Sequence, residues 1–528
     1  MISRRVVRRI MRRHGAVVLF TLSAVIGTAL GLAAVRFASR VSEAPQLSAR
    51  VVAPFSPGPA ARIGPSLHRF PVILPLHPDT SRVHGALAPI FSDDVFSHAG
   101  IAVVAQDGTL LFGKNEEKAL APASTMKLLA ASTALNMLGP KYRFETAFVA
   151  EAQPRAGVIS GPLWFVGSGD PLFTREDLRG GVAMLAHAGV RRIDGDIVVD
   201  DSAFRGPERN AKWDADDLQY GFAAGASAVS LDQGTAELDV VPGLPGNPAT
   251  IRVVPPNRDV RVIGEIESVL QGDGTLVHIL LKPDTGDPAE PSNVFDVDGR
   301  VEIGQPQVFW EPVHNLARYA GYALLSMLQE RAISVAGTVR IDRAPLAART
   351  LWQHRSQPLE EILRDMLTTS NNHTAEQLLR VVGAQERHVG TLQTGVEAEI
   401  NVLKMLDIPT TGLRIVDGSG LSPSNRVAAL TLARLTAAEL QTPAGERFLR
   451  GLPRVGIEGT VKYHRLHRAL GKARAKSGHI EGVNALAGTV QTAKHGRVAF
   501  AIIVNDPRAY GDEVTSGQDR MLDVLAGL

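Results

Sequence analysis

The stretch Pro122-Ala123-Ser124-Thr125-Met126-Lys127, continued by the apolar run Leu128-Leu129-Ala130-Ala131, decides how this chain is interpreted. Proline is favoured in the first turn of a helix, and the apolar pattern runs on to a stop at Gly139-Pro140. We therefore expect a helix that begins at this proline. Ser124 and Lys127 then lie three residues apart on one face of its opening turn, where their side chains can touch.

A serine and a lysine in contact can form a nucleophile and its base. The serine hydroxyl is a weak nucleophile until a neighbouring base takes its proton, and a lysine is such a base only when it is neutral. Burial at a helix N-terminus, or a second cation nearby, lowers a lysine pKa. An isolated S-x-x-K is more often a helix cap and a solvated charge. The chain contains no other S-x-x-K, and further motifs follow this one.

Length and composition limit the classes of function. A chain of 528 residues is too long for one compact core, so two to four domains are expected. The net charge is +2, and six arginines within the first 13 residues supply more than this excess, so no basic surface indicates nucleic-acid binding. There is no cysteine, which excludes thiol catalysis, disulfides and cysteine-based metal sites.

The N-terminal segment, residues 1–36, reads as a membrane anchor or signal segment. After the basic start, residues 15–35 carry no charge, which is long enough to span a bilayer. The basic flank predicts that the N-terminus stays inside and that everything after Arg36 is exported, on the periplasmic or cell-wall side of the membrane. We favour an uncleaved anchor over a cleaved signal peptide because no small-x-small cleavage site is apparent.

The rest of the chain reads as an interrupted α+β domain. Residues 37–90 are rich in proline and predict a spacer. A hairpin is expected over 101–112, through Asp107-Gly108, and three strands near the C-terminus over 473–476, 485–490 and 498–504. Between them, 150–309 alternates like strands, with one helix over 175–188. We expect a catalytic domain over 91–149 and 310–528, interrupted by a β-rich insertion over 150–309 with two subdomains.

Two further motifs accompany Ser124 and Lys127. Ser370-Asn371-Asn372 lies between two expected helices, and Lys476-Ser477-Gly478 ends an expected strand, where glycine permits a close backbone approach. Each triplet alone is more often a cap or a turn. The order S-x-x-K, S-x-N, K-[ST]-G, each in this structural context, is much more specific.

On these motifs the chain resembles the penicillin-recognising serine DD-peptidases. It is most similar to the penicillin-binding protein 4 type, the class C D-alanyl-D-alanine carboxypeptidase/endopeptidase family. The long separation of Ser124 from Ser370 is similar to that family, which carries inserted domains there. Three more stretches match: Gly167-Ser168-Gly169-Asp170-Pro171, Trp213 to Tyr220, and Asp417-Gly418-Ser419-Gly420-Leu421-Ser422. The resemblance covers residues 91–528 and implies an antiparallel sheet with helices, as in β-lactamases.

The resemblance also implies roles for individual residues. Ser124 would be acylated and Lys127 would be its base. Ser370 would relay a proton to the leaving amine, and Asn372 would bind the substrate amide. The remaining positions would bind substrate: Lys476 and Ser477 at the terminal carboxylate, Gly478 along the strand, His479 through its backbone N–H in the oxyanion hole with that of Ser124, and Asp217 near the diamino-acid side chain.

The implied activity is hydrolysis of D-Ala-D-Ala bonds in peptidoglycan stem peptides, with cross-link bonds as a second candidate substrate. The resemblance also implies β-lactams as covalent inhibitors. No cofactor is implied, and the 15 histidines show no metal-ligand spacing. Two alternatives stay open: a β-lactamase, which shares the motif order, and a catalytically silent, membrane-tethered wall-binding scaffold. His373 reads as packed or solvated, and the Asp417–Ser422 stretch as a flexible loop that could line the cleft near Lys476.

Overall fold

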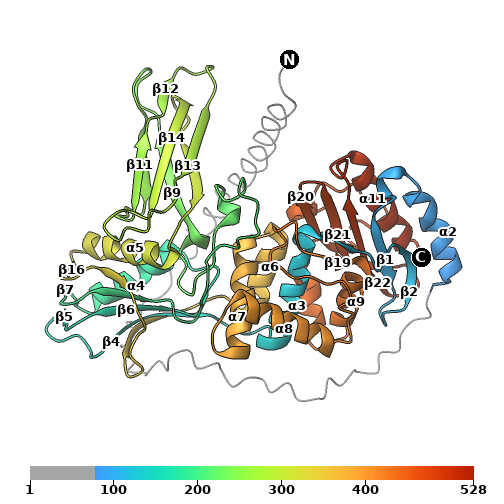
Figure 1. Ribbon diagram of the computed structural model, residues 1–528, viewed down its shortest axis with the longest axis horizontal. Coiled ribbons are helices and arrows are strands. Elements are labelled where there is room, and N and C mark those ends of the chain that lie inside the picture. The colour runs from blue at the N-terminus through green and yellow to red at the C-terminus, as the bar shows by residue number, and fades with distance from the viewer. Residues whose placement is uncertain (1–77) are drawn as a thin grey trace. The chain divides into compact units, whose positions relative to one another are not determined.

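The structure, a computed structural model, describes residues 78–528 (Figure 1). The expected anchor over 15–35 and most of the spacer lie outside the described residues. Within 78–528, no helix has both the length and the apolar character that crossing a bilayer requires. Order begins before the expected residue 91: α2 (Thr80–Leu87) is capped by Asp79 and buries Val83 and Leu87, so these residues belong to the folded domain and not to the spacer.

A five-stranded antiparallel sheet joins the two ends of the described chain. Its strand order is β2-β1-β22-β21-β20, so the hairpin near residue 100 pairs with the C-terminal strands. The strands are β1 (Gly100–Val104), β2 (Leu110–Lys114), β20 (Ala473–Ile480), β21 (Val483–Gln491) and β22 (Arg497–Asn505). The expected hairpin and the three expected C-terminal strands all form, and β20 is an edge strand.

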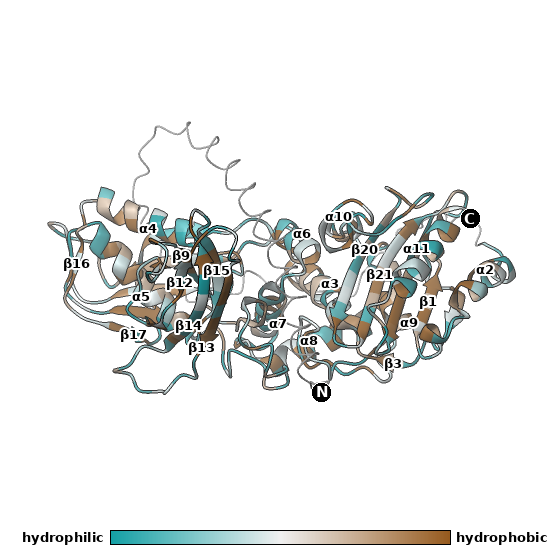
Figure 2. Ribbon diagram, turned by 90° about the horizontal axis from the view of Figure 1, so that it is seen from above, coloured by the Kyte–Doolittle hydropathy of each residue, from teal (hydrophilic) through white to brown (hydrophobic). Residues whose placement is uncertain are grey.

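The two faces of this sheet differ because side chains alternate along a strand. On β22, Ala499 and Ala501 point to the face covered by α9 (Ala429–Glu439), and their small size lets the helix approach closely. Phe500 and Ile502 point to the other face, which packs against α11 (Asp512–Ala526). Both faces are therefore buried, and Figure 2 colours β1 brown for its apolar residues.

The expected helix after Ser124 forms, with a tighter start. Residues Ala123–Met126 make one 3₁₀ turn, α3 (Lys127–Leu138) continues it, and Gly139 ends it with a φ of +80°. The first nine residues of α3 are all buried, which marks a helix at the centre of a domain. Around it in Figure 1 lie α6 (Leu359–Thr369), α7 (Asn372–Arg387), α8 (Leu392–Met405) and α9, and α10 (Gly445–Gly451) packs on α6.

The inserted region is longer than expected. Its main sheet has the order β17-β8-β6-β4-β18, with α4 (Arg175–His187) and α5 (Leu316–Glu330) packed in the same core. The strands are β4 (Glu145–Ala150), β6 (Leu163–Gly167), β8 (Ile197–Asp200), β17 (Val339–Ile341) and β18 (Arg349–Arg355). Because β18 pairs with β4, the inserted region spans 145–355 and not 150–309.

The remaining strands belong to the inserted region, except for β3 and β19, which form a small two-stranded sheet. Two sheets, β10-β9-β15 and β11-β14-β12 with β13 paired to β14, lie between β8 and α5 in the chain. Their strands are β9 (Thr235–Val241), β10 (Thr250–Val254), β11 (Val260–Gly264), β12 (Glu267–Val269), β13 (Leu276–Leu281), β14 (Asn293–Glu302) and β15 (Gln307–Pro312). Short strands are β3 (Ala119–Leu120) with β19 (Val427–Ala428), and β5 (Val158–Ile159), β7 (Arg192–Ile193) and β16 (Ser334–Val335). The expected α+β class, with a β-rich insertion, is confirmed.

Candidate active site

Ser124 and Lys127 lie in contact at the start of α3. The Lys127 Nζ is 2.9 Å from the Ser124 Oγ. Ala123, directly before the serine, has a φ of +47°, a left-handed conformation that costs a non-glycine residue about 1–3 kcal/mol and is often found at active sites. The tight 3₁₀ turn thus presents the serine hydroxyl beside the lysine amine.

Two other segments also reach the lysine amine. Lys127 Nζ is 2.6 Å from the Asn372 Oδ1 and 2.6 Å from the Ser419 main-chain carbonyl oxygen. The side chain is fully buried, and this burial lowers the pKa of Lys127 to about 7, against the opposing attraction of Asp417 and Glu376. Near neutral pH a substantial fraction of this amine is therefore unprotonated and able to accept a proton.

Asn372 is positioned by both the catalytic helices and the inserted region. Helix α6 ends at Thr369 and is followed by its C-cap Ser370, which has a φ of +64°. Asn371 caps α7 by accepting from the Thr374 N–H. Asn372 then begins α7, and its Nδ2 donates to the Phe222 carbonyl oxygen at 2.9 Å. The Asn372 amide is thus fixed at both ends, while Ser370 lies half-buried at the turn before it.

Strand β20 borders the serine on another side. A Cβ atom at Gly478 would lie 2.9 Å from the Ser124 backbone nitrogen and 2.8 Å from the Pro122 carbonyl oxygen, so only glycine allows the strand this close. Lys476 is fully buried and donates to the Ser477 carbonyl oxygen at 2.7 Å. Burial and the charge of Lys127 hold the pKa of Lys476 well below its usual value.

The other predicted substrate positions lie around the same strand and the inserted region. Ser477 Oγ is 2.7 Å from Thr460 Oγ1. His479 is exposed, with its ring stacked near Tyr510 at a centroid distance of 6.3 Å. Asp217 is half-buried on the inserted segment that also carries Trp213.

The Asp417–Ser422 stretch is a buried turn and not a flexible loop, and its contact is with Lys127. Asp417 accepts from the Gly420 and Ser422 N–H groups at 2.7 Å each, and from the Trp213 indole at 2.9 Å. The turn therefore joins the inserted region to the site. His373 is likewise packed: its Nδ1 is 2.7 Å from the Gly225 carbonyl oxygen, and burial lowers its pKa to about 4.

Three groups that shape the site were not predicted from the sequence motifs. Two are main-chain carbonyls, of Phe222 and Ser419, which no side-chain pattern identifies. The third is Glu376, whose Oε1 accepts from the Gly418 and Ser419 N–H groups at 3.0 Å each. Glu376 follows Asn372 by four residues on α7, so the same-face spacing of a helix was a signal that could have found it.

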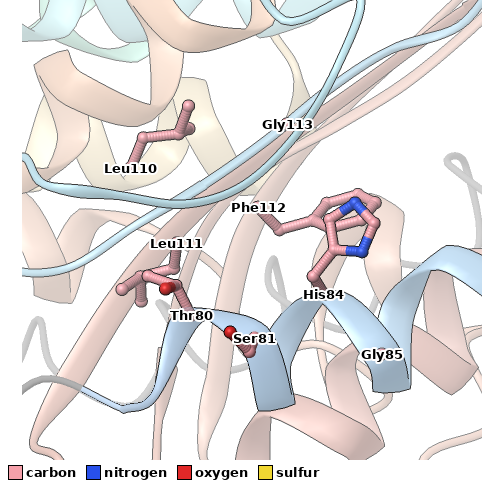
Figure 3. Close-up of a pocket in the computed structure, with 8 residues that line it drawn as sticks. All are labelled: Thr80, Ser81, His84, Gly85, Leu110, Leu111, Phe112 and Gly113. Carbon is pink, nitrogen blue, oxygen red and sulfur yellow. The ribbon is translucent and has the colours of Figure 1, made fainter.

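An open cavity of about 530 Å³ lies elsewhere, at the other edge of the catalytic sheet (Figure 3). It forms between α2 and β2, with the His84 ring 5.4 Å from the Phe112 ring between their centroids. Its lining residues are Thr80, Ser81, His84, Gly85, Leu110, Leu111, Phe112 and Gly113. Since β2 and β20 are opposite edges of one sheet, this cavity is separate from the serine site.

A serine paired with a buried lysine, completed by an asparagine from a second helix and a lysine from an edge strand, defines the class of penicillin-recognising serine acyl-transfer enzymes. A family comparison agrees with that class. The chain belongs to the D-Ala-D-Ala carboxypeptidase 3 (S13) family, whose model matches residues 83–527. It is therefore a serine-type D-Ala-D-Ala carboxypeptidase, and the resemblance to the penicillin-binding protein 4 type is confirmed.

Individual relatives support this membership over most of the chain. A D-alanyl-D-alanine carboxypeptidase of Actinomadura sp. (strain R39) is 30% identical over 436 residues, which cover 79% of each chain. A carboxypeptidase of Mycobacterium tuberculosis is 30% identical over 452 residues, 81% of each chain. The crystal structure of penicillin binding protein 4 from Haemophilus influenzae has the same fold, with a TM-score of 0.71 at 24% identity, covering 86% of this chain and all of that one.

Proposed function

We propose that this enzyme hydrolyses the terminal D-Ala-D-Ala bond of peptidoglycan stem peptides through an acyl-enzyme on Ser124. The observation that carries the proposal is the buried Lys127 amine, 2.9 Å from the Ser124 Oγ and with a pKa lowered to about 7. A base whose pKa lies near the working pH is well suited to take and return a proton.

In the first half-reaction, neutral Lys127 takes the Ser124 proton while the Oγ attacks the carbonyl carbon of the penultimate D-Ala. The backbone N–H groups of Ser124 and His479 stabilise the resulting oxyanion; one such donor is typically worth about 10²–10³ in rate. Ser370 relays the proton to the departing amine as the C–N bond breaks. Water then attacks the ester carbonyl while neutral Lys127 takes a proton from the water. Lys127 returns that proton to the departing Ser124 Oγ, and the shortened peptide leaves with a new carboxyl terminus.

The carboxylate of the terminal D-Ala binds Lys476 and Ser477. Lys476 is a buried amine whose charged form is disfavoured by burial and by Lys127, so an incoming carboxylate would compensate a cation that the protein leaves poorly paired. The close approach of Gly478 to the Ser124 backbone sets this carboxylate site beside the nucleophile. The arrangement therefore favours peptides that end in a free carboxylate.

The stem peptide lies along β20 as an added strand. Because β20 is the edge of its sheet, its outer N–H and C=O groups can pair with an extended peptide, and Asn372 can bind the substrate amide from the other side. A cross-linked stem presents the same D-Ala carbonyl in an amide with a larger leaving amine, so cross-link hydrolysis would use the same nucleophile and base. Asp217, on the inserted segment, is the candidate partner for a cationic diamino-acid side chain.

We also propose that residues 15–35 tether the enzyme to the cytoplasmic membrane, with the catalytic domain outside the cytoplasm. The support is the uncharged run of 21 residues behind a basic flank. Alkaline carbonate extraction of cell membranes tests it: the full-length chain should stay in the pellet, and a chain lacking residues 1–36 should be released. Release of the full-length chain would contradict the tether.

Intact-mass spectrometry of the protein with and without benzylpenicillin tests the catalytic proposal. Penicillin binding protein 4 of Haemophilus influenzae has been solved in complex with a β-lactam. For this chain we expect a lasting adduct of one drug mass on Ser124. Drug consumption without an adduct would favour a β-lactamase, and a folded protein that does neither would favour a silent scaffold.

A further inference from the structure

The lysine amine is held by the main chain of the Asp417–Ser422 turn as well as by side chains. The Ser419 carbonyl oxygen lies 2.6 Å from Lys127 Nζ, as close as the Asn372 side chain. A main-chain carbonyl can hold this amine only if the turn that carries it is fixed. What fixes this turn therefore helps to set the position of the base.

Two carboxylates hold the turn, in different ways. Asp417 lies within it and accepts from Gly420 and Ser422 N–H groups, which sets its internal shape. Glu376 belongs to α7 and accepts from the N–H groups of Gly418 and Ser419, which ties the turn to the helix. Glu376 is thus the link between the turn and the helix that also carries Asn372.

The turn has little freedom to shift by other means. A Cβ at Gly418 would lie 2.8 Å from the Ala375 carbonyl oxygen, and a Cβ at Gly420 would lie 1.9 Å from the Ala123 carbonyl oxygen. The turn therefore packs tightly against α7 on one side and against Ala123, the residue before Ser124, on the other. A movement of the turn on α7 would be transmitted both to the nucleophile and to its base.

Glu376 is itself enclosed by charged and titratable groups. Arg380 on the same helix places its Nη1 3.6 Å from the Glu376 Oε2 and donates from Nη2 to the Pro207 carbonyl oxygen of the inserted region at 2.9 Å. Asp417 from the turn, Glu399 from α8 and Lys127 from α3 are the other groups that interact with this cluster. Glu376 is only 1% exposed, and this burial, together with the charge of Asp417, raises the pKa of Glu376 to about 7 against the attraction of Arg380.

We propose that Glu376 is a positioning residue for acylation: its carboxylate fixes the Gly418-Ser419 main chain so that the Ser419 carbonyl holds the Lys127 amine against Ser124. The inference rests on the proposed Ser124 acyl-enzyme and adds a residue that touches neither substrate nor nucleophile. Glutamine at position 376 would keep one acceptor oxygen for the turn, whereas methionine would fill similar volume without any oxygen.

The test compares Glu376→Gln and Glu376→Met in the full-length protein. The second-order rate of benzylpenicillin acylation is followed by quenched intact mass across about pH 5.5 to 9. We expect Glu376→Met to lose about 10- to 100-fold because the base is misplaced. Glu376→Gln should keep most of the plateau rate, with its acid limb moved to lower pH because a carboxylate that raises the Lys127 pKa is gone.

Glu399→Gln and Glu399→Met are the matched controls. Glu399 is also fully buried beside this cluster, and neither of its oxygens has a hydrogen-bond partner among the described residues. Circular dichroism establishes that each variant is folded, and we expect the Glu399 variants to acylate like the wild type. If Glu376→Met does not fold, the retained plateau and shifted limb of Glu376→Gln decide the question.

Three results would overturn the inference: folded Glu376→Met acylating at the wild-type rate, Glu376→Gln losing as much as Glu376→Met, or Glu399→Met losing as much as Glu376→Met. In each of these the wild type is acylated, so the proposed function stands while the role of Glu376 fails. A wild type that forms no adduct removes the proposed function and the inference together.

Discussion

Two buried lysines lie in this site, and their surroundings differ. Lys127, at the start of α3, contacts a serine hydroxyl, an asparagine oxygen and a main-chain carbonyl, which come from three separate segments. The side-chain amine of Lys476, on β20, makes one hydrogen bond among residues 78–528, to the carbonyl of the neighbouring Ser477. The hydrogen bonds of the Lys127 amine are thus in place before substrate binds. The Lys476 amine is left with room for a partner that the substrate can supply. The difference assigns proton transfer to Lys127 and carboxylate binding to Lys476.

The largest effect should come from Ser124→Ala, which removes the atom that becomes acylated. We expect no benzylpenicillin adduct by intact mass and no release of D-Ala from a D-Ala-D-Ala peptide. Ser516→Ala, an exposed serine on α11, is the control and should behave as the wild type. An adduct on Ser124→Ala would place the nucleophile elsewhere and remove the basis of the comparison.

Lys127→Met should have the second-largest effect. We expect its acylation rate to be about 10²- to 10⁴-fold below that of the wild type, the usual contribution of a general base. Methionine fills the buried space without a charge, so the protein should stay folded. Stopped-flow or quenched mass measurements give the rate, and exposed Lys141→Met provides the control. A loss of less than tenfold would mean that Lys127 is not the principal base.

Lys476→Met should affect substrates according to their charge. For a peptide that ends in a free carboxylate we expect kcat/KM to fall by about 10- to 100-fold, the value of a hydrogen bond to a charged group. A peptide whose C-terminus is amidated should lose much less. Equal losses for both peptides would show that Lys476 acts on the acylation step itself, as Lys127 does, and would erase the distinction between the two lysines.

Trp213→Phe should have the smallest effect on acylation. It removes the indole N–H from the buried Asp417 carboxylate and leaves the turn with its other hydrogen bonds, so we expect only a few-fold loss of rate. The free energy of unfolding should fall by about 1–3 kcal/mol because a buried acceptor loses a donor. Trp352→Phe, on β18, controls for loss of a tryptophan in the inserted region; a rate loss confined to Trp213→Phe would tie the inserted region to the site.

Short-range sequence signals predicted much of this molecule. The Ser124 helix, the 101–112 hairpin and the three C-terminal strands rest on local patterns, and each forms. The return point of the insertion was placed too early, because α5 has the same amphipathic pattern whichever core it packs against. The pairing of β18 with β4, two strands far apart in sequence, and the packing of α5 in the core of their sheet show that this helix belongs to the inserted region.

The candidate site divides in the same way. Side chains in short motifs, such as Ser124, Lys127 and Asn372, could be found in sequence, and the structure brings these three into contact. The carbonyls of Phe222 and Ser419 could not, because every residue has a carbonyl and only the fold decides which one meets the lysine. The positive φ angles of Ala123 and of the predicted Ser370 could not be found either, since neither residue type favours that conformation.

The most direct test of the account is the pH dependence of Ser124 acylation by benzylpenicillin, followed by intact mass in the wild-type protein. Lys127 acts as a base only when unprotonated, so the rate should be low in acid, rise through an apparent pKa near the value of about 7 set by its burial, and level off above it. At pH values below this pKa, the rate should fall about tenfold for each pH unit. A rate independent of pH across this range, in protein that remains folded, would contradict a neutral Lys127 as the base.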